Sequence, residues 1–405
     1  MTMRGKQVFA GLLAMVMVGS CVTSEKLPLP LASAAKTATH IDETQLLDVA
    51  VGLFDPNVPT SEKERTEQRI DLAVRTAEAR YMAVALADTL QGTGYWGQVR
   101  VVPRGLTLLD VNVNGVILVS NGGQLKLRIK AADATGRVWL TKEYSGEPDT
   151  RSYKDGATTR RDPFQNVYVR IADDLSAMRK KMQPADLKQI QRLAQLRFDA
   201  DVAPYAYADY VKQSRDGKYQ VVRLPAEDAP LSVRLEQVRE REYALMDTLD
   251  DQYRLSSGQI SSSYLGWRKS NNAEMEEERD LKNSARTRML LGAAAVIGGI
   301  AAAADSSSST AGQIAGSVAV AGGIEAFKNG MGKRAEAKAH AESLKQQTES
   351  FSAEVAPANV EVEGRVVELR GSTEQQFLEW RRLLRDLYQN ETGVAPATPA
   401  TAARP

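Results

Sequence analysis

The 405-residue chain is 43% hydrophobic and 25% charged, which is enough apolar sequence to bury at least one ordinary core. Its 52 basic residues are almost balanced by 51 acidic ones, and this balance argues against the basic stripe of a nucleic-acid-binding protein. The composition therefore favours other proteins or a membrane as partners, with no nucleic acid.

The N-terminus carries the most specific signal. Arg4 and Lys6 precede an apolar run over 8–18, and the small residues Gly19 and Ser20 come directly before Cys21. A positive start, a short apolar stretch and small residues are typical of a secretory signal peptide, and the run is too short for a spanning helix. We expect residues 1–20 to be that signal. The alternative is an ordinary secretory signal beside an incidental cysteine.

The order Val18-Gly19-Ser20-Cys21 resembles a bacterial lipobox. That resemblance implies cleavage before Cys21 and a diacylglycerol on its sulfur, and two or three acyl chains hold a protein at a membrane more firmly than one. Because Cys21 is the only cysteine, no disulfide can form within the chain. Val22 follows it where inner-membrane lipoproteins commonly carry Asp, so the resemblance implies an outer-membrane location, with the chain facing the periplasm.

The next segments alternate between strand and helix signals. Residues 21–42 read as a lipidated, extended tether, 46–54 as a buried strand, and 61–90 as a helix with Ser61 and Glu64 as a capping box. Val99–Val102 predicts another strand. Three more strands, over 111–119, 124–131 and 137–144, are separated by short glycine-containing turns and should form antiparallel hairpins. A helix over 164–182 completes an α+β domain spanning 43–182.

This order of elements is similar to a family of envelope lipoprotein domains. The family includes the curli-secretion lipoprotein, the lipoprotein activators of penicillin-binding proteins and the N-terminal domain of TolB. The similar segments are 49–51, 99–102, 111–115 and 125–137, about a third of the chain. The family shares no catalytic site, so the resemblance implies docking, activation or ring assembly at the outer membrane.

A helical region follows over 183–288. A long apolar stripe between 230 and 289 includes Leu235, Leu249 and Trp267 and is interrupted at Glu242. Such a stripe needs a partner helix, as in a coiled coil, from this chain or from another copy.

Residues 289–331 have a different composition, since 289–304 carry no charge and 310–327 are again rich in Gly and Ala. Small residues recur there every fourth position, which favours close helix packing, as in a glycine zipper; they are Ala295, Gly299, Ala303, Gly312, Gly316, Ala319 and Gly323. We expect a helical hairpin. Three interpretations remain open: a hairpin packed against protein, a membrane-inserted hairpin, and a weakly ordered segment.

The C-terminal part, 332–392, predicts a helix, one bent strand or two short strands over 360–369, and a final helix that begins near Ser372. Residues 393–405 form a tail rich in Pro, Ala and Thr that should be disordered.

Residue types for catalysis are scarce. His40 and His340 are the only histidines, no metal-ligand spacing occurs, and no phosphate-binding glycine loop is present. Acidic pairs occur at 173–174, 199 with 201, and 250–251, and we expect them on solvated faces. The sequence therefore predicts no catalytic residue, no metal and no cofactor.

The expected fold class is α+β: an N-terminal mixed sheet with packed helices, then a long helical region with a glycine-rich hairpin, then a small β-α unit. The expected function is that of a non-enzymatic outer-membrane lipoprotein, a periplasmic scaffold or docking component that binds envelope proteins. The alternative is a homo-oligomer, a ring-forming subunit of a transport or secretion complex that uses the glycine-rich hairpin.

Overall fold

The computed structural model describes most of the chain between Ala34 and Thr392. The described residues are 34–37, 40–106, 109–153, 162–226, 230–302, 335, 338–343, 345–346, 358–362, 365–369 and 373–392. The predicted signal peptide and the tail over 393–405 lie outside them.

A five-stranded mixed sheet forms the centre of the fold, with the order β2-β1-β3-β4-β5. The strands are β1 (Val49–Gly52), β2 (Val99–Val102), β3 (Val111–Ser120), β4 (Leu125–Asp133) and β5 (Val138–Gly146). β1 pairs in parallel with both neighbours, and β3, β4 and β5 are antiparallel, as the glycine turns predicted. β1 and β2 are buried at every position, whereas β4 alternates between buried and more exposed residues.

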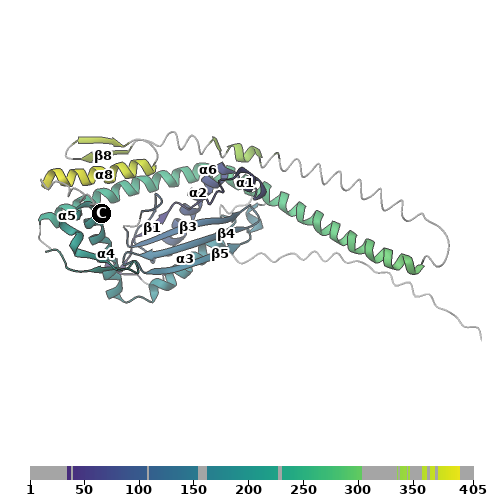
Figure 1. The fold of residues 1–405 in the computed structure, drawn as a ribbon, viewed down its shortest axis with the longest axis horizontal. Coiled ribbons are helices and arrows are strands. Elements are labelled where there is room, and N and C mark those ends of the chain that lie inside the picture. Colours follow the sequence, from purple (N-terminus) through teal and green to yellow (C-terminus); the bar gives the residue numbers. More distant parts are fainter. Residues whose placement is uncertain are drawn as a thin grey trace, which may run out of the picture.

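Helices surround this sheet (Figure 1). They are α1 (Glu62–Glu67), α2 (Leu72–Gln91), α3 (Gln165–Lys180), α4 (Pro184–Val202), α5 (Pro204–Tyr207), α6 (Pro230–Ala302) and α8 (Thr373–Thr392). Short 3-10 turns occur at Glu43–Gln45, Thr150–Tyr153 and Ala208–Tyr210, and two small hairpins pair β6 (Val211–Gln213) with β7 (Tyr219–Val221) and β8 (Ala358–Val362) with β9 (Arg365–Leu369).

The helix expected over 61–90 is two helices. Ser61 caps α1 by accepting a hydrogen bond from the Glu64 amide, but α1 ends at Glu67 and Arg69 adopts a positive φ of 54°. Asp71 then caps α2 by accepting from the Val74 amide. The continuous helix was therefore a wrong prediction, because a second capping residue restarts the helix after a left-handed residue.

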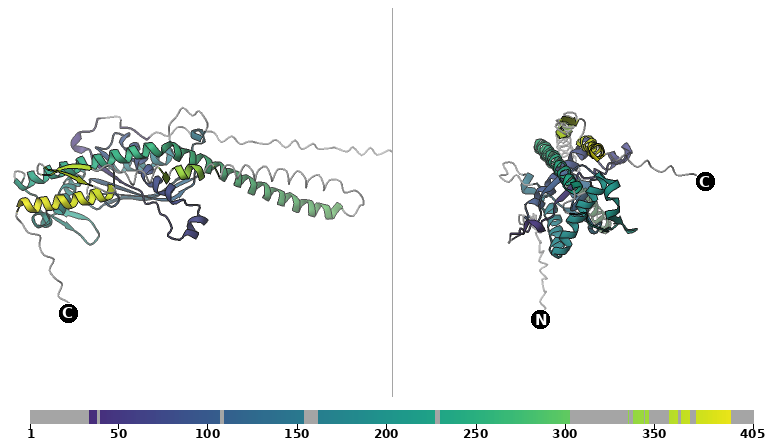
Figure 2. Two further views of the ribbon diagram at one scale, coloured as in Figure 1. Left: turned by 90° about the horizontal axis from the view of Figure 1, so that it is seen from above. Right: turned by 90° about the vertical axis from the view of Figure 1, so that its left-hand side faces the viewer.

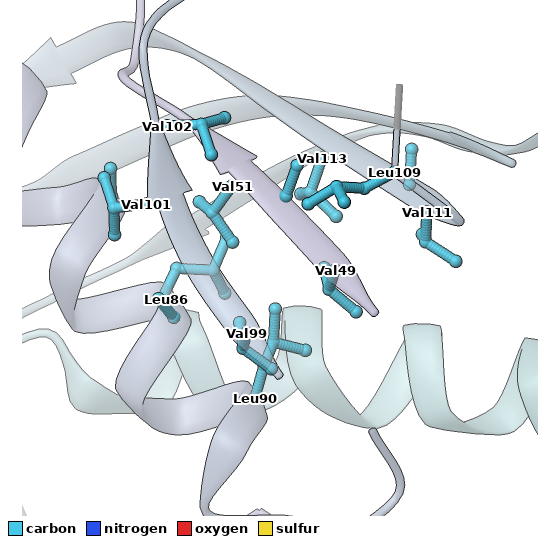
Figure 3. Close-up of a cluster of buried hydrophobic side chains, with 14 of the residues drawn as sticks. Val49, Val51, Leu86, Leu90, Val99, Val101, Val102, Leu109, Val111 and Val113 are labelled. Carbon is cyan, nitrogen blue, oxygen red and sulfur yellow. The ribbon is translucent and has the colours of Figure 1, made fainter. Parts of the chain in front are cut away.

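α2 and α3 contact each other and pack on the sheet. Leu86 and Leu90 of α2 lie over alternate valines of β1 and β2, including Val51 and Val99 (Figure 3). Gly115 of β3 leaves room for Phe54, whose ring would be only 2.7 Å from a Cβ at that position. A single cluster of buried side chains runs from Leu47 to Leu384, so α4, α6 and α8 share one core with the sheet. The predicted α+β class is confirmed.

Candidate interaction site: the long helix and its anchoring contacts

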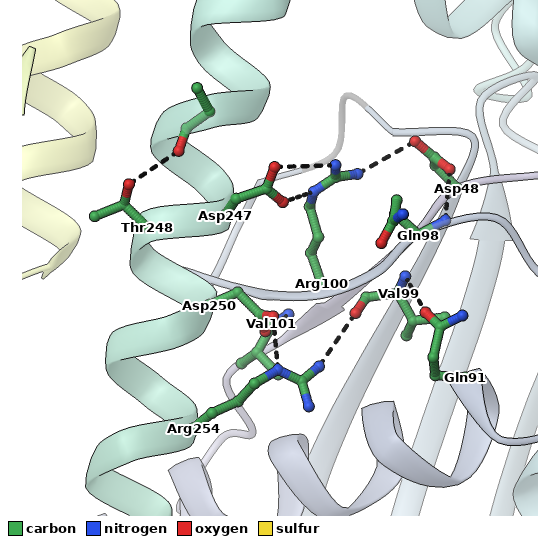
Figure 4. A network of polar contacts seen from close by, with 11 residues as sticks. Asp48, Gln91, Gln98, Val99, Arg100, Val101, Asp247, Thr248, Asp250 and Arg254 are labelled. Carbon is green, nitrogen blue, oxygen red and sulfur yellow. Dashed lines mark hydrogen bonds and ion pairs between the residues drawn. The ribbon is translucent and has the colours of Figure 1, made fainter.

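The 73-residue helix α6 covers the outer edge of β2. Asp250 accepts a hydrogen bond from the Val101 amide at 2.7 Å, and one turn later Arg254 donates to the Val99 carbonyl oxygen at 3.3 Å (Figure 4). Gln91 of α2 accepts from the Val99 amide at 2.9 Å. These side chains satisfy backbone groups that an added strand would otherwise bind, which is one way that proteins protect a sheet edge.

Charged pairs fix the same stretch of α6 in position (Figure 4). The guanidinium of Arg100, on β2, lies between Asp247 of α6 at 2.5 Å and Asp48 at 3.2 Å. Arg254 pairs with Asp250 at 2.6 Å and also reaches Asp88 of α2. Burial raises the pKa of Asp250, while its bonds to Arg254 and the Val101 amide oppose that rise.

Two further carboxyl groups lie beside the first turns of α6. Burial raises the pKa of Asp110 to about 7, and the charge of Asp48 adds to that rise. Burial also raises the pKa of Asp199 on α4 to about 7. In both cases the positive charge of Arg239 on α6 opposes the rise. This arginine therefore faces two carboxyl groups whose pKa values lie near 7.

A buried carboxylate joins α2, β3 and α6 further along the helix. Glu78 accepts hydrogen bonds from the hydroxyls of Ser120 at 2.5 Å and Tyr264 at 2.8 Å, and it pairs with Arg75 at 3.0 Å. Burial raises its pKa, and Arg75 opposes the rise. Glu78 therefore links α2, β3 and α6 through its hydrogen bonds and its ion pair.

Arg268 is the last strong anchor on α6. It is 1% exposed, and its Nη1 pairs with Asp162, ahead of α3, at 2.7 Å. Its guanidinium carbon lies 3.9 Å from the centre of the Tyr264 ring and close to the rings of Phe164 and Tyr81. The turn between β3 and β4 packs directly on this part of α6, because a Cβ at Gly122 would overlap the Arg268 carbonyl oxygen.

The C-terminal helix α8 is fastened to α6 by a second buried arginine. Arg381 donates to Glu242 of α6 at 2.6 Å, reaches Asp201 of α4, and lies 5.6 Å from the centre of the Phe198 ring. Glu242 is the residue that interrupts the apolar stripe in the sequence, and it is 1% exposed. The interruption therefore marks a helix–helix contact.

Beyond these anchors α6 leaves the body of the molecule. Glu274 and Met275 still lie beside Arg69 and Gly123, and the helix then continues to Ala302 as a projecting rod (Figure 1). We call residues 276–302 the arm. At a rise of 1.5 Å per residue the arm is about 40 Å long. The view from above in Figure 2 shows the same projection.

A returning helical segment lies against α6 close to the base of the arm. The hydroxyls of Ser263 and Ser343 are 3.1 Å apart, and a Cβ at Gly266 would be 2.6 Å from the His340 ring. Ala341 packs beside the apolar cluster that includes Ile260 and Trp267. At these positions α6 therefore contacts a helical segment of the same chain.

The sequence-predicted site residues fall in two places. Ala295 and Gly299 lie on the backbone of the arm, whereas Val18, Gly19, Ser20, Cys21, Ala303, Gly312, Gly316, Ala319 and Gly323 lie outside the described residues. The solvated placement expected for the acidic pairs is wrong for Asp250 and Asp199, which are 9% and 3% exposed. The sequence around these two residues shows only apolar neighbours, and from that alone their roles as internal hydrogen-bond or charge partners could not be predicted.

Within the described part of the chain, no three His, Cys, Asp or Glu side chains come together as a metal site. None of its helices has the length and hydropathy needed to cross a bilayer. Comparison with known proteins found no matching family model, no curated relative and no similar solved structure.

Proposed function

We propose that this chain is a non-enzymatic lipoprotein of the outer membrane that acts as a periplasmic scaffold, and that the arm is the element it presents to an envelope assembly. The observation that carries the proposal is the division of α6. Its first part is held to the body by ion pairs of the buried arginines Arg100, Arg268 and Arg381, and its last part extends about 40 Å beyond that body.

The described start of the chain supports a tethered arrangement. The Ala35 amide donates to Asp173 of α3 at 2.9 Å, and the Thr37 amide donates to the Thr93 carbonyl oxygen at 3.0 Å, so the chain joins the body here. Ala34 lies thirteen positions after Cys21, with twelve residues between them. Fully extended, this stretch reaches at most about 45 Å. A lipid on Cys21 would thus hold the body within about 45 Å of the bilayer. The arm would reach a partner about 40 Å from the body.

The internal geometry favours scaffolding over catalysis. The buried carboxylates of Glu78, Glu242 and Asp250 face arginines, hydroxyls or backbone amides of the chain itself. Such contacts fix the direction of the arm relative to the sheet. A scaffold that offers the arm to a partner requires a fixed direction of this kind.

The lipid anchor is tested with Cys21→Ser in the full chain, expressed in its own cells. Labelled palmitate should enter the parent and not the variant, and the variant should leave the envelope fraction. Ser20→Thr, which keeps the cysteine, serves as the processing control. Equal labelling and equal sedimentation of Cys21→Ser and parent would refute the anchor.

The arm is tested by placing a photoreactive amino acid at single positions from 289 to 302, with Leu255 on the body part of α6 as a control that is 66% exposed. Crosslinks to one envelope protein from the arm, and none from position 255, are expected. Crosslinks only between copies, together with a discrete large oligomer by light scattering after detergent extraction, would instead support the ring-forming subunit.

A further inference from the structure

The two edges of the central sheet differ in what occupies them. At β2, side chains of α2 and α6 bond to the backbone of the edge. β5 forms the opposite edge, and in the part of the chain that the structure describes no strand pairs beyond it (Figure 1). β5 has nine residues and contains no proline. A strand of this kind can accept a further strand at its edge.

The backbone hydrogen bonds of β3 show which way each of its residues points. The Asp55 amide donates to the Gly115 carbonyl oxygen at 2.7 Å, and the Ile117 amide donates to the Asp55 carbonyl oxygen at 2.9 Å. Gly115 and Ile117 therefore point their backbone groups toward the β1 side of β3. Because the backbone groups of successive residues point to opposite sides of a strand, Val116 faces β4, where its partner in the register is Arg128.

The same alternation, carried through β4, gives the direction of the residues of β5. Arg128 faces β3, so the next residue, Ile129, faces β5, where its partner is Lys142. Lys142 therefore faces β4. Thr141 and Glu143, on either side of it, point their backbone groups away from the sheet. The register of β4 with β5 is regular over these residues, so no bulge reverses the alternation.

These two outward positions are open. Thr141 and Glu143 are both exposed, and among the described residues no protein group bonds to their amides or carbonyl oxygens. Ser145, the next outward position, is different, because its carbonyl oxygen accepts a hydrogen bond from Arg170 of α3. The edge therefore offers two amides and two carbonyl oxygens at the two-residue spacing that a neighbouring strand requires.

The surroundings of this edge are basic. The exposed or half-buried charged side chains of β4 and β5 are four basic and one acidic: Lys126, Arg128, Lys130, Lys142 and Glu143. Glu143 already pairs with Lys126 at 2.6 Å and with Arg128 at 2.7 Å. Lys130 is exposed and lies opposite Thr141 in the register, and no ion pair engages it within the described residues. Its long side chain can extend past the short threonine to the open edge.

Charge complementarity favours an acidic strand of another protein as the occupant. In an antiparallel pair of two β5 strands with Thr141 opposite Glu143, Lys142 would face Lys142 of the second copy, and like charges directly opposite each other are destabilising. The terminal segments of the chain offer no acidic excess either. Residues 22–33 contain one Glu and one Lys, and residues 393–405 contain one Arg and no acid.

We propose that the open edge of β5 binds an extended, acidic segment of another protein, which adds a strand to the sheet through the backbone of Thr141 and Glu143 and places an acidic side chain opposite Thr141, within reach of Lys130. Main-chain hydrogen bonds supply the affinity in such a complex, and alternate side chains supply the specificity. This site is separate from the arm and does not depend on the lipid anchor.

The charge requirement is tested with two fluorescent eight-residue peptides, one of alternating valine and glutamate and one of alternating valine and lysine. Fluorescence anisotropy with the purified full chain should show binding of the glutamate peptide and none of the lysine peptide. Lys130→Glu should weaken the binding at least about tenfold. Lys63→Glu, the same change at a lysine of α1 whose side chain is 84% exposed, should leave it unchanged. Absence of binding, or equal binding of both peptides, would overturn the proposal.

The strand addition is tested by hydrogen exchange, followed at single amides by nuclear magnetic resonance. The glutamate peptide should slow exchange of the Thr141 and Glu143 amides at least about tenfold and leave the Val101 amide, which Asp250 already binds, unchanged. Thr141→Pro removes one outward donor without removing a bond to β4 and should weaken binding, whereas Thr141→Val keeps the donor and should not. Circular dichroism checks that both variants fold. Peptide binding without protection of these two amides in the parent would overturn the proposal.

Discussion

The two parts of α6 are built on opposite principles. From Pro230 to Met275 the helix carries charged side chains that would be costly to bury alone. Glu242 and Arg268 pair with charged residues outside α6, and Asp250 pairs with Arg254 of α6 and accepts from the Val101 amide of β2. From Met289 to Ala302 it carries no charged residue. Buried charge fixes where the first part lies, because a displaced pair leaves an unpaired ion. The second part lacks such pairs and has small residues for packing instead.

This difference assigns separate roles to the two parts. Hydrophobic packing around Trp267 and Tyr264 tolerates small shifts, but ion pairs with fixed geometry do not. The body part of α6 therefore sets the direction of the arm, and in the proposed scaffold the arm is the part that meets a partner. Each of the following changes affects either the body part of α6 or the arm.

The largest effect is expected at the base of the arm. Arg268→Met leaves Asp162 buried without its cation, at 5% side-chain exposure, and should lower the free energy of unfolding by about 3–5 kcal/mol. Adding Asp162→Asn should recover part of the loss, because no unpaired charge then remains. Urea denaturation followed by circular dichroism measures both. Arg382→Met, at an arginine 82% exposed, should change stability by less than about 0.5 kcal/mol.

A pH dependence is expected beside the first turns of α6. The folded-state pKa of Asp110, about 7, is well above its ordinary value of 3.8, so the folded protein holds a proton that the unfolded chain has lost. Stability should therefore be greatest below pH 4 for this group and fall as pH rises to about 7, by up to about 4 kcal/mol. Asp48, Arg239 and Tyr243 are the titratable or charged groups that face it.

Asp110→Asn should flatten this pH dependence, because the amide oxygen can still accept from the Asp48 amide and cannot titrate. Unfolding free energies at pH 5 and pH 8 measure the change. Asp199→Asn should flatten a second, similar part of the profile. The two effects should be coupled and their sum should differ from the effect of the double variant, because both acids share Arg239 as a charge partner. A profile unchanged by both substitutions would show that neither acid is protonated in the folded state.

The sequence predicted the elements well and their contacts poorly. Strand spacing and glycine turns were sufficient for the antiparallel β3-β4-β5 order, and the long stripe was sufficient for α6. Trp267, which belongs to that predicted stripe, is 7% exposed. These features depend on periodicity, which a single sequence contains.

The buried charges depend on distant partners, which periodicity does not reveal. Asp250 looked like a solvated neighbour of Asp251, yet its partner is the backbone of β2, 149 residues away. Glu242 looked like a defect in the stripe, yet its partner is Arg381, 139 residues away. A charged residue that interrupts an apolar stripe is thus a usable sign of a buried pair.

A moderate effect is expected at the sheet edge. Asp250→Ala leaves the Val101 amide without its acceptor and should cost about 1–3 kcal/mol, with faster hydrogen exchange at that amide. Asp250→Asn keeps an acceptor and should cost less. Asp251→Ala, at the exposed neighbour, is the control and should have almost no effect. Equal losses for the two alanine variants would mean that the backbone contact contributes little.

The smallest effect on the body is expected from the arm itself. The side chains of Glu274 and Met275 lie against the sheet domain and precede residue 289, so a chain in which 289–317 is replaced by a short Gly/Ser loop should keep its unfolding free energy within about 0.5 kcal/mol. In the parent, hydrogen exchange should be faster in peptides from 289–302 than in peptides from 245–270, because the arm lacks the buried pairs that hold the body part of α6. A loss of more than about 2 kcal/mol in the free energy of unfolding would show instead that the arm and the body unfold as one unit. The arm would then stabilise the sheet domain.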